Sequence, residues 1–358
     1  MSPVENVAPL RIAQWTTGNV ARETVKAVLS RPDLELVGAF AHSPEKVGVD
    51  VGTLCGLDEL LGVAATGDVD ELLCGRLDCV IFTPLHFDVA AVTQILRAGV
   101  NIVTSAEFLT GVTLPEADRT AVSDAARDGG ATIFGSGINP GFMHMLTAIA
   151  SGMSTRVTRA AVIESVDVAQ FLGDANFQSV GWGRPKGDPG HADDVRKGTA
   201  VFVEAVDAFA RLMRIELDDI TCSVDFAYAT EDFVADGVAI AAGHVAGMDV
   251  RWHGVVDGIE VVALNQLWTA TSKLDPPWTA DEGYRLEVIG DPSVHVKVDF
   301  MPTPEDLANL TPGVMRSIGL RITAAPLVNA NPAVCAAAPG IDNYADLHDV
   351  TARLLPEA

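Results

Sequence analysis

The chain has 358 residues, of which 48% are hydrophobic and 20% are charged, a composition typical of a globular protein large enough for two domains. Its formal net charge of −24 opposes binding to nucleic acid or to an anionic membrane, because both partners require clustered lysine and arginine. Its five cysteines include no C-x-x-C pair, which argues against a disulfide framework and a zinc site. Because neither a targeting signal nor a membrane-spanning run is found, we expect a cytoplasmic protein.

The first informative stretch is residues 11–22, where an apolar strand is followed by a turn of small residues and then by a helical pattern. A dinucleotide-binding βαβ unit begins in this way, with the pattern G-x-G-x-x-G in its turn. Thr16, Gly18 and Ala21 occupy the three glycine positions here, so the glycine that approaches the pyrophosphate is the one that remains. We predict that a nucleotide cofactor contacts Thr16, Thr17, Gly18, Asn19 and Val20.

The second predicted strand, residues 34–41, runs into the sequence AHSPEK of residues 41–46. An enzyme that uses NAD usually has an acidic residue at this strand end, where it binds the ribose 2′-hydroxyl group. This chain instead has His42, Ser43 and Lys46, which can donate hydrogen bonds to a 2′-phosphate. We therefore predict NADP as the cofactor, with NAD as the alternative, while Glu45 leaves open the interpretation of this segment as a solvated loop.

Strands and helices continue to alternate along residues 78–135. Residues 78–84 read as a third buried strand, and we predict that Thr83 and Pro84 at its end contact the cofactor. The next strand begins at Asn101 and delivers Glu107 at its carboxyl end, the edge where open α/β sheets bind their ligands. With a further strand at residues 131–135, this alternation predicts a doubly wound parallel sheet of the Rossmann type.

The sequence GSGINPGF, residues 135–142, marks the passage to a second domain. After residue 156, alternating apolar runs follow one another with few helices between them, which predicts an α+β domain on a largely antiparallel sheet. We predict domains at residues 1–150, 151–310 and 311–358, with the last segment packed back on the first domain. The predicted helices can cover only one face of the antiparallel sheet. We expect a second copy of the chain to cover the other face in a homodimer.

The segment of residues 172–198 in the second domain is rich in glycine and aspartate. Its length and composition fit either a lid over a site or a mobile surface loop, and the sequence leaves both interpretations open.

Glu107 is the candidate residue for proton transfer. It lies between Ala106 and Phe108, and a carboxylate desolvated by such apolar neighbours has a raised pKa, nearer the range in which it exchanges protons at neutrality. The alternative is a surface glutamate that caps the next element. His86 and His144 lie near the predicted cleft, but neither belongs to a His-Glu-x-x-His motif or another metal-ligand spacing, which argues against a metal site.

Four stretches together resemble the family of 2,4-diaminopentanoate dehydrogenase and the native amine dehydrogenases, whose nucleotide-binding domain is similar to that of dihydrodipicolinate reductase. They are residues 15–21, the strand end Ser105-Ala106-Glu107, the turn GINPGF of residues 137–142 and the sequence PLVNANP of residues 326–332. The resemblance implies that Glu107 is the catalytic acid/base and that Asn139 lines the junction of nicotinamide and substrate. The His-His-x-x-Lys motif of dihydrodipicolinate reductase and the Glu-Lys-Pro motif of the sugar-type oxidoreductases are both absent from the chain.

The resemblance implies an NADP-dependent amine dehydrogenase, which deaminates a small amine oxidatively or, in reverse, aminates a ketone or aldehyde reductively with ammonia. Phe142, Phe171 and Trp182, together with Trp268, are predicted to form an apolar substrate pocket. Two alternatives stay open: an amino acid dehydrogenase of the 2,4-diaminopentanoate type, and a regulatory protein that binds NADP without turnover.

Overall fold

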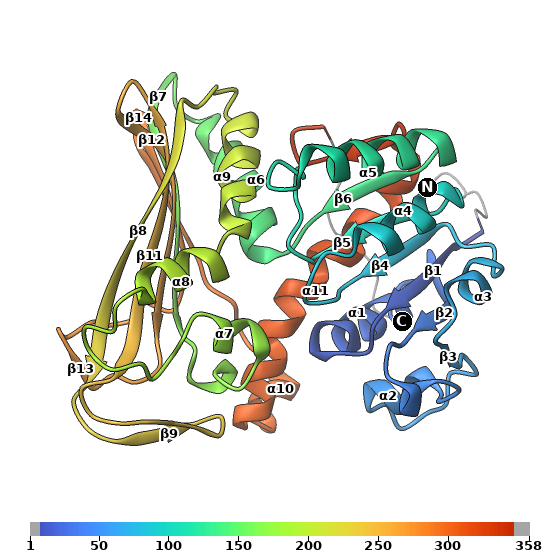
Figure 1. Cartoon of the computed structure of the whole chain (residues 1–358), viewed down its shortest axis with the longest axis horizontal. Helices are drawn as coiled ribbons and strands as arrows, with labels where there is room; N and C mark the ends of the chain where they lie inside the picture. The colour runs from blue at the N-terminus through green and yellow to red at the C-terminus, as the bar shows by residue number, and fades with distance from the viewer. Residues whose placement is uncertain (1–7, 347–358) are drawn as a thin grey trace. The chain divides into compact units, whose positions relative to one another are not determined.

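The computed structural model describes residues 8–346 and divides the chain into two compact units (Figure 1). The first unit contains the residues up to Gly141 together with those from Ser317 onward, and the second contains Phe142–Arg316. The sequence placed the corresponding boundaries after residues 150 and 310. Helix α6 (Met143–Ser151) belongs to the second unit because it packs on the strands of that unit's sheet. Residues 1–7 and 347–358 of the predicted domains lie outside the described part of the chain.

The first unit is built on a seven-stranded sheet with the order β16-β6-β5-β4-β1-β2-β3, in which all neighbouring strands are parallel. The strands are β1 (Leu10–Trp15), β2 (Leu34–Phe40), β3 (Ala65–Thr66), β4 (Cys79–Phe82), β5 (Asn101–Thr104), β6 (Thr132–Gly135) and β16 (Gly340–Asp342). Every residue of β4 is buried, as expected of a central strand that helices cover on both faces. The predicted doubly wound parallel sheet is confirmed.

The helices of this unit present apolar faces to the core. Those that precede β6 are α1 (Asn19–Leu29), α2 (Val51–Cys55), α3 (Val69–Leu73), α4 (Val89–Arg97), α5 (Glu116–Gly129) and the short 3₁₀ helix η1 (Pro44–Lys46). Helices α2, α3 and α4 also begin at an aspartate cap. Asp88 starts α4 by accepting hydrogen bonds from the backbone N–H groups of Ala90 and Ala91. Val92, Ile95 and Leu96 of the same helix are fully buried and join the apolar core.

The strand order reverses at β1. Strand β2 lies on one side of β1 and β4 on the other, so the chain leaves these strand ends in opposite directions. In open α/β sheets this arrangement leaves a crevice at the carboxyl ends of the two diverging strands, which is where ligands bind.

Helix α11 (Pro312–Ala336) contains two internal prolines. An asparagine side chain replaces the hydrogen bond that the second proline cannot make. Pro332 has no N–H group to donate to the carbonyl oxygen of Val328. The buried Asn331 donates instead, with its Nδ2 atom 3.1 Å from Val328 O and 2.8 Å from Leu327 O. After the helix, β16 pairs in parallel with β6 and so returns the chain to the first sheet.

The second unit is built on a seven-stranded sheet with the order β13-β8-β11-β12-β7-β14-β15. The strands are β7 (Arg156–Asp167), β8 (Asp219–Ala229), β11 (Val245–Val256), β12 (Ile259–Thr269), β13 (Leu274–Asp275), β14 (Gly283–Asp291) and β15 (Val294–Val298), with β9 (Phe233–Ala235) and β10 (Val238–Ile240) forming a separate hairpin. All pairs in the larger sheet are antiparallel except β12 with β7. The predicted α+β domain on a largely antiparallel sheet is confirmed.

The helices of the second unit besides α6 are α7 (Ala175–Ser179), α8 (His191–Gly198), α9 (Val201–Leu212), α10 (Pro304–Ala308) and the 3₁₀ helix η3 (Ala169–Phe171). The sequence allowed residues 172–198 to be either a lid or a mobile loop. In the structure, this segment contains α7 and α8. His191 Nε2 lies 2.9 Å from Val180 O, and Arg184 forms an ion pair of 2.9 Å with Asp194. The segment therefore has secondary structure and internal contacts of its own.

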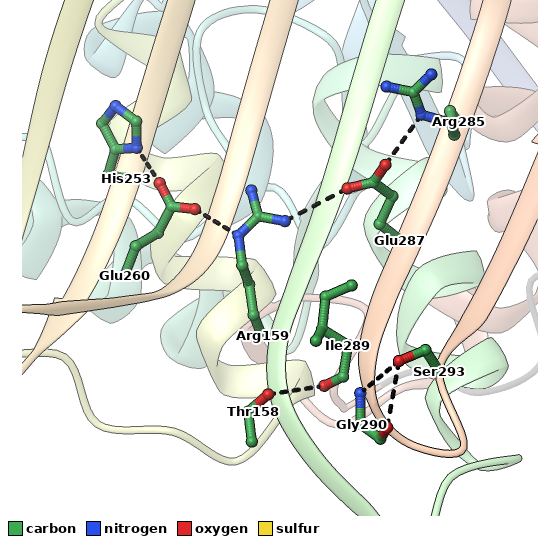
Figure 2. Close-up of polar contacts among 9 residues, drawn as sticks. All are labelled: Thr158, Arg159, His253, Glu260, Arg285, Glu287, Ile289, Gly290 and Ser293. Atoms are coloured by element: carbon green, nitrogen blue, oxygen red, sulfur yellow. Dashed lines mark hydrogen bonds and ion pairs between the residues drawn. The ribbon is translucent and has the colours of Figure 1, made fainter.

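Helices α6, α8 and α9 cover one face of the second sheet, and residues 142–316 place no helix on the other face (Figure 1). That open face carries an ion-pair network across four strands (Figure 2). Arg159 lies between Glu260 and Glu287, with N–O distances of 2.5 and 3.4 Å, while His253 contacts Glu260 and Arg285 contacts Glu287. Burial raises the pKa of Glu260, but hydrogen bonds from Arg159 and His253 outweigh burial and leave that pKa lowered.

The substitution Asn331→Ala tests whether this side chain replaces the hydrogen bond that Pro332 cannot make. We expect the free energy of unfolding, measured by urea denaturation, to fall by about 1–3 kcal/mol because a buried carbonyl loses its donor. In a Pro332→Ala background, the N–H group of residue 332 can donate to Val328 O. Asn331→Ala should therefore lower the free energy of unfolding by less in that background. Equal costs in the two backgrounds would contradict this role.

Candidate functional site

At the first glycine position of the turn after β1, the backbone has a conformation that favours glycine although the residue is threonine. Thr16 has a φ of 75°, in the left-handed region that favours glycine. Its N–H donates to the carbonyl oxygen of Phe40 at 2.9 Å, and its hydroxyl oxygen lies 3.2 Å from that of Thr83. These bonds hold a threonine in the conformation that glycine adopts without strain, which explains how the turn departs from the usual pattern.

Gly18 is exposed and caps helix α1, and a Cβ atom added to it would meet no protein atom within 4 Å. Packing within the protein therefore does not require a glycine here, whereas a phosphate that approaches the backbone does. Helix α1 has no side-chain cap and no acidic residue in its first turn, so its positive end is not neutralised by its own residues. Of the other predicted turn residues, Thr17 is buried, Asn19 is exposed and Val20 is half-buried.

The predicted 2′-phosphate donors lie at the carboxyl end of β2, and one of them reaches the β1 turn. Lys46 Nζ donates to the Thr17 hydroxyl oxygen at 3.1 Å, which brings a cation to the segment that carries Gly18. His42 packs edge-on against Phe40 with ring centroids 4.8 Å apart, and Ser43 immediately precedes η1. The structure thus joins the two cofactor segments that the sequence predicted separately.

A cavity of about 540 Å³ lies at the carboxyl ends of β1 and β4, where the strand order reverses. Its lining comprises Trp15, His42, Phe82, Pro84, Leu85, His86, Phe87, Asp88, Val89 and Ala90. The predicted contact Thr83 has a different position: its hydroxyl donates to Trp15 O at 3.1 Å and lies 2.9 Å from Gln14 Nε2. Thr83 therefore braces β1 against β4, whereas His42 and Pro84 face the cavity.

Glu107 follows β5 at the same edge of the sheet, but its neighbours do not desolvate it as predicted. Its φ is 32°, and its side chain is 49% exposed, whereas Ala106, Phe108 and Leu109 are buried. The positive φ turns the carboxylate away from the core into which these neighbours pack. The prediction of a buried carboxylate is therefore wrong, and the group is accessible to a substrate and to water.

Packing on two sides holds the loop that carries Glu107. The ring of Phe108 stacks on Phe87 of the loop after β4, with centroids 4.6 Å apart and planes inclined by 8°. On the other side, a Cβ atom added to Gly135 would lie 2.0 Å from the carbonyl oxygen of Phe108, so β6 can approach this closely because position 135 is glycine. The loops after β4 and β5 and the end of β6 thus form one packed edge.

His86 is a functional candidate that the sequence placed near the predicted cleft without assigning it a role. Its Nδ1 atom lies 3.3 Å from Glu107 Oε2, and it also lines the cavity. Both residues follow neighbouring parallel strands, β4 and β5, whose carboxyl ends meet at one edge of the sheet. That shared position was the signal in the sequence that could have paired them.

Asn139, predicted to line the nicotinamide junction, lies four residues after the end of β6 and is half-buried. It is joined to Pro140 by a cis peptide bond in the first unit. This position at the carboxyl edge of the first sheet agrees with the region that the sequence proposed, while its role in binding stays a prediction.

The predicted substrate-pocket residues Phe142, Phe171 and Trp182 belong to the second unit. Phe171 packs on Phe177 with ring centroids 6.0 Å apart, and Phe177 packs on Trp268 at 5.5 Å. The structure therefore connects Phe171 to Trp268 through an aromatic residue that the sequence did not single out. The inclusion of Phe142 and Trp182 in the same pocket stays a prediction.

His144 has no place among the candidate catalytic groups. It lies in α6, is fully buried, and stacks on Phe209 with ring centroids 5.5 Å apart. Burial lowers the pKa of His144 to about 3, so the ring is neutral at physiological pH. Within residues 8–346, no three His, Cys, Asp or Glu side chains are grouped so that they could hold a metal ion. Over the same residues, no helix combines the length and apolarity needed to cross a membrane.

Comparison with known proteins connects this geometry to an enzyme class. The family model "Dihydrodipicolinate reductase, N-terminus" matches residues 16–135, which include the turn after β1, Glu107 and the residues that line the cavity except Trp15. The chain is 28% identical over 350 residues to an amine dehydrogenase from Streptomyces virginiae, covering 93% of this chain and 94% of that protein. It is 45% identical over 69 residues to the 4-hydroxy-tetrahydrodipicolinate reductase of a Nostoc species, covering 19% of this chain and 25% of that enzyme.

Among solved structures, that of an amine dehydrogenase from Mycobacterium smegmatis superposes with a TM-score of 0.79 at 22% identity. The match covers 98% of this chain and 99% of the other. It shows that the two chains share a fold over nearly their whole length. The resemblance to amine dehydrogenases and to a dihydrodipicolinate reductase-like nucleotide-binding domain is thereby confirmed.

Proposed function

We propose that the chain is an NADP-dependent amine dehydrogenase of the cytoplasm, which interconverts a small amine with a ketone or aldehyde and ammonia. The observation that carries the proposal is the position of Glu107: its accessible carboxylate follows β5 and contacts His86 on the wall of the cavity where the strand order reverses. The relative from Streptomyces virginiae, matched along nearly the full length of both chains, supports an oxidoreductase that acts on amines.

The residues of the first unit fit a nicotinamide dinucleotide. The open space at Gly18 and the uncapped start of α1 suit a pyrophosphate, and Lys46 stands beside them. The bound cofactor would supply the hydride that reduces the substrate's carbon–nitrogen double bond. The protein's own task is then to hold the substrate and to move protons at Glu107.

Reductive amination needs one group that can give and accept a proton. Addition of ammonia to the carbonyl carbon produces a carbinolamine, and protonated Glu107 gives its proton to the hydroxyl group that leaves as water. The remaining iminium is a cation, and the Glu107 carboxylate left behind is negative, so attraction between them stabilises this state. In the opposite direction, the carboxylate accepts the proton from the attacking water.

We expect Lys46→Ala to reduce the preference for NADPH over NADH by about 1–2 kcal/mol, the contribution of one charge-assisted contact to a 2′-phosphate. Titration of both dinucleotides against parent and variant, by calorimetry or fluorescence, measures the preference. Lys26→Ala is the control, because Lys26 lies in the last turn of α1 and pairs with Glu23. Equal affinity of the parent for NADPH and NADH would refute the prediction of NADP.

The variant Glu107→Gln tests the central assignment. It keeps the size and polarity of the side chain but removes its exchangeable proton and charge, so NADPH should still bind while kcat falls by about 100-fold or more. Steady-state reductive amination of short ketones and aldehydes with ammonia, followed by NADPH absorbance, measures the rate.

The matched control is Glu116→Gln, an exposed acid in the first turn of α5, which should leave the rate unchanged. A Glu107→Gln variant that retains most of its activity would mean that Glu107 is a surface cap. Tight NADPH binding by a parent protein that turns over no amine or carbonyl compound would favour the non-catalytic regulatory protein.

We further propose that a second copy of the chain covers the open face of the second sheet, forming a homodimer. Ile163 and Leu267 line a cavity of about 200 Å³, and Arg285 of the ion-pair network on this face belongs to the same lining. The face thus offers both apolar contacts and charged groups to a partner of the same composition.

Light scattering at micromolar concentration should give twice the mass of the chain, and Ile163→Asp should shift the protein toward the monomer because it places a charge in the contact. Val234→Asp, a change at an exposed position of β9, should leave the mass unaltered. A monomeric parent would exclude the homodimer.

A further inference from the structure

The contact between His86 and Glu107 has the geometry of a proton path. His86 Nδ1 lies 3.3 Å from Glu107 Oε2, and the exposed fractions of the two side chains are 78% and 49%. Within residues 8–346, neither the other imidazole nitrogen of His86 nor the Glu107 carboxylate has a further hydrogen-bond or ion-pair partner. One side of the imidazole therefore faces the carboxylate, and the other side is open to water.

Packed backbone segments support the two residues that make this contact. The residues next in sequence, Phe87 and Phe108, stack face to face, and Phe108 is almost fully buried. The backbone of Phe108 is in turn pressed against Gly135 of β6. The stack holds the two loops together, and with them the backbone positions of His86 and Glu107.

The reaction proposed above consumes a proton in every turnover. A ketone, ammonia, NADPH and one proton yield an amine, NADP⁺ and water, with the hydride and the proton accounting for the two hydrogens added. Glu107 loses its proton to the departing water and must regain one from solvent before the next cycle. While substrate covers the carboxylate, a group that contacts both Glu107 and water can speed the transfer of a proton from solvent to Glu107.

We propose that His86 is the proton-exchange partner of Glu107, carrying protons between its carboxylate and solvent during amine dehydrogenation. The inference rests on the proposed function. Imidazole suits the task because it takes up and releases protons near neutral pH and has two nitrogens on opposite sides of its ring. The other titratable side chains on the cavity wall are His42 and Asp88, and the Asp88 carboxylate is occupied by the N–H groups of Ala90 and Ala91.

The decisive variant is His86→Asn, whose amide can still donate a hydrogen bond to Glu107 but cannot exchange a proton near neutral pH. We expect kcat for reductive amination to fall by about 10- to 100-fold, with the thermal midpoint and the NADPH dissociation constant unchanged. Because position 86 is open to solvent, added imidazole should restore much of the lost kcat in proportion to its concentration. The control His295→Asn, at an exposed position of β15, should keep the parent rate and not respond to imidazole.

A second measurement tests the contact without turnover. In protein labelled with nitrogen-15 at histidine, Nδ1 of His86 should carry the proton in the neutral ring, whereas a free neutral histidine carries it mainly on Nε2. In Glu107→Leu the Nε2–H form should predominate, because the acceptor for Nδ1–H is gone.

Three outcomes would overturn the proposal. A His86→Asn variant within twofold of the parent kcat excludes a role in proton exchange. A loss of kcat that imidazole does not restore, or one accompanied by weaker NADPH binding, assigns His86 a structural role. A bare Nδ1 in the parent excludes the contact itself. If the parent turns over no amine or carbonyl compound, the proposed function fails and the proton-exchange role with it, while the tautomer of His86 still decides whether the contact exists.

Discussion

The first unit depends on the reversal of strand order at β1. Because β2 and β4 flank this strand, the segments that follow β1 and β4 diverge and leave the strand ends uncovered. The Thr16 turn, Lys46 and the loop after β4 all meet at this place. Thr83 keeps β1 and β4 together just below the crevice through its bonds to Gln14 and Trp15. The residues predicted to contact the cofactor and those proposed to transfer protons come from distant parts of the sequence and are thereby collected on one edge.

The sequence predicted this edge because strand ends can be read from local patterns. A run such as Cys79–Phe82, apolar on both faces, is typical of a central parallel strand, and parallel strands present their carboxyl ends on the same side. The accessibility of Glu107 could not be predicted in the same way. It depends on the sign of one backbone angle, which is set by the packing of Phe108 between Phe87 and Gly135. Contacts of that kind arise only after the strands have assembled.

In the second unit, too, local sequence patterns predicted the strands but not the contacts between residues far apart in the sequence. Alternating apolar residues predicted strands that pair in an antiparallel way, and all but one pair do so. The parallel pairing of β7 with β12 brings together residues about 100 positions apart, which no local pattern encodes. It also places Arg159 beside Glu260, and β14 adds Glu287 on the other side. Charged residues that are far apart in the sequence thus neutralise one another across an open sheet face.

An accessible carboxylate suits the proposed chemistry better than the buried one that the sequence suggested. A carboxyl group buried among apolar residues stays protonated and offers little to a cationic iminium. Two opposite unit charges 4 Å apart attract by about 1 kcal/mol in water and by about 4 kcal/mol at the effective dielectric constant of about 20 typical near a protein surface. An exposed Glu107 is therefore a weak electrostatic partner until a bound substrate displaces water from it. In the proposed reaction, its stabilising effect then belongs mainly to the covered state in which the substrate is an iminium cation.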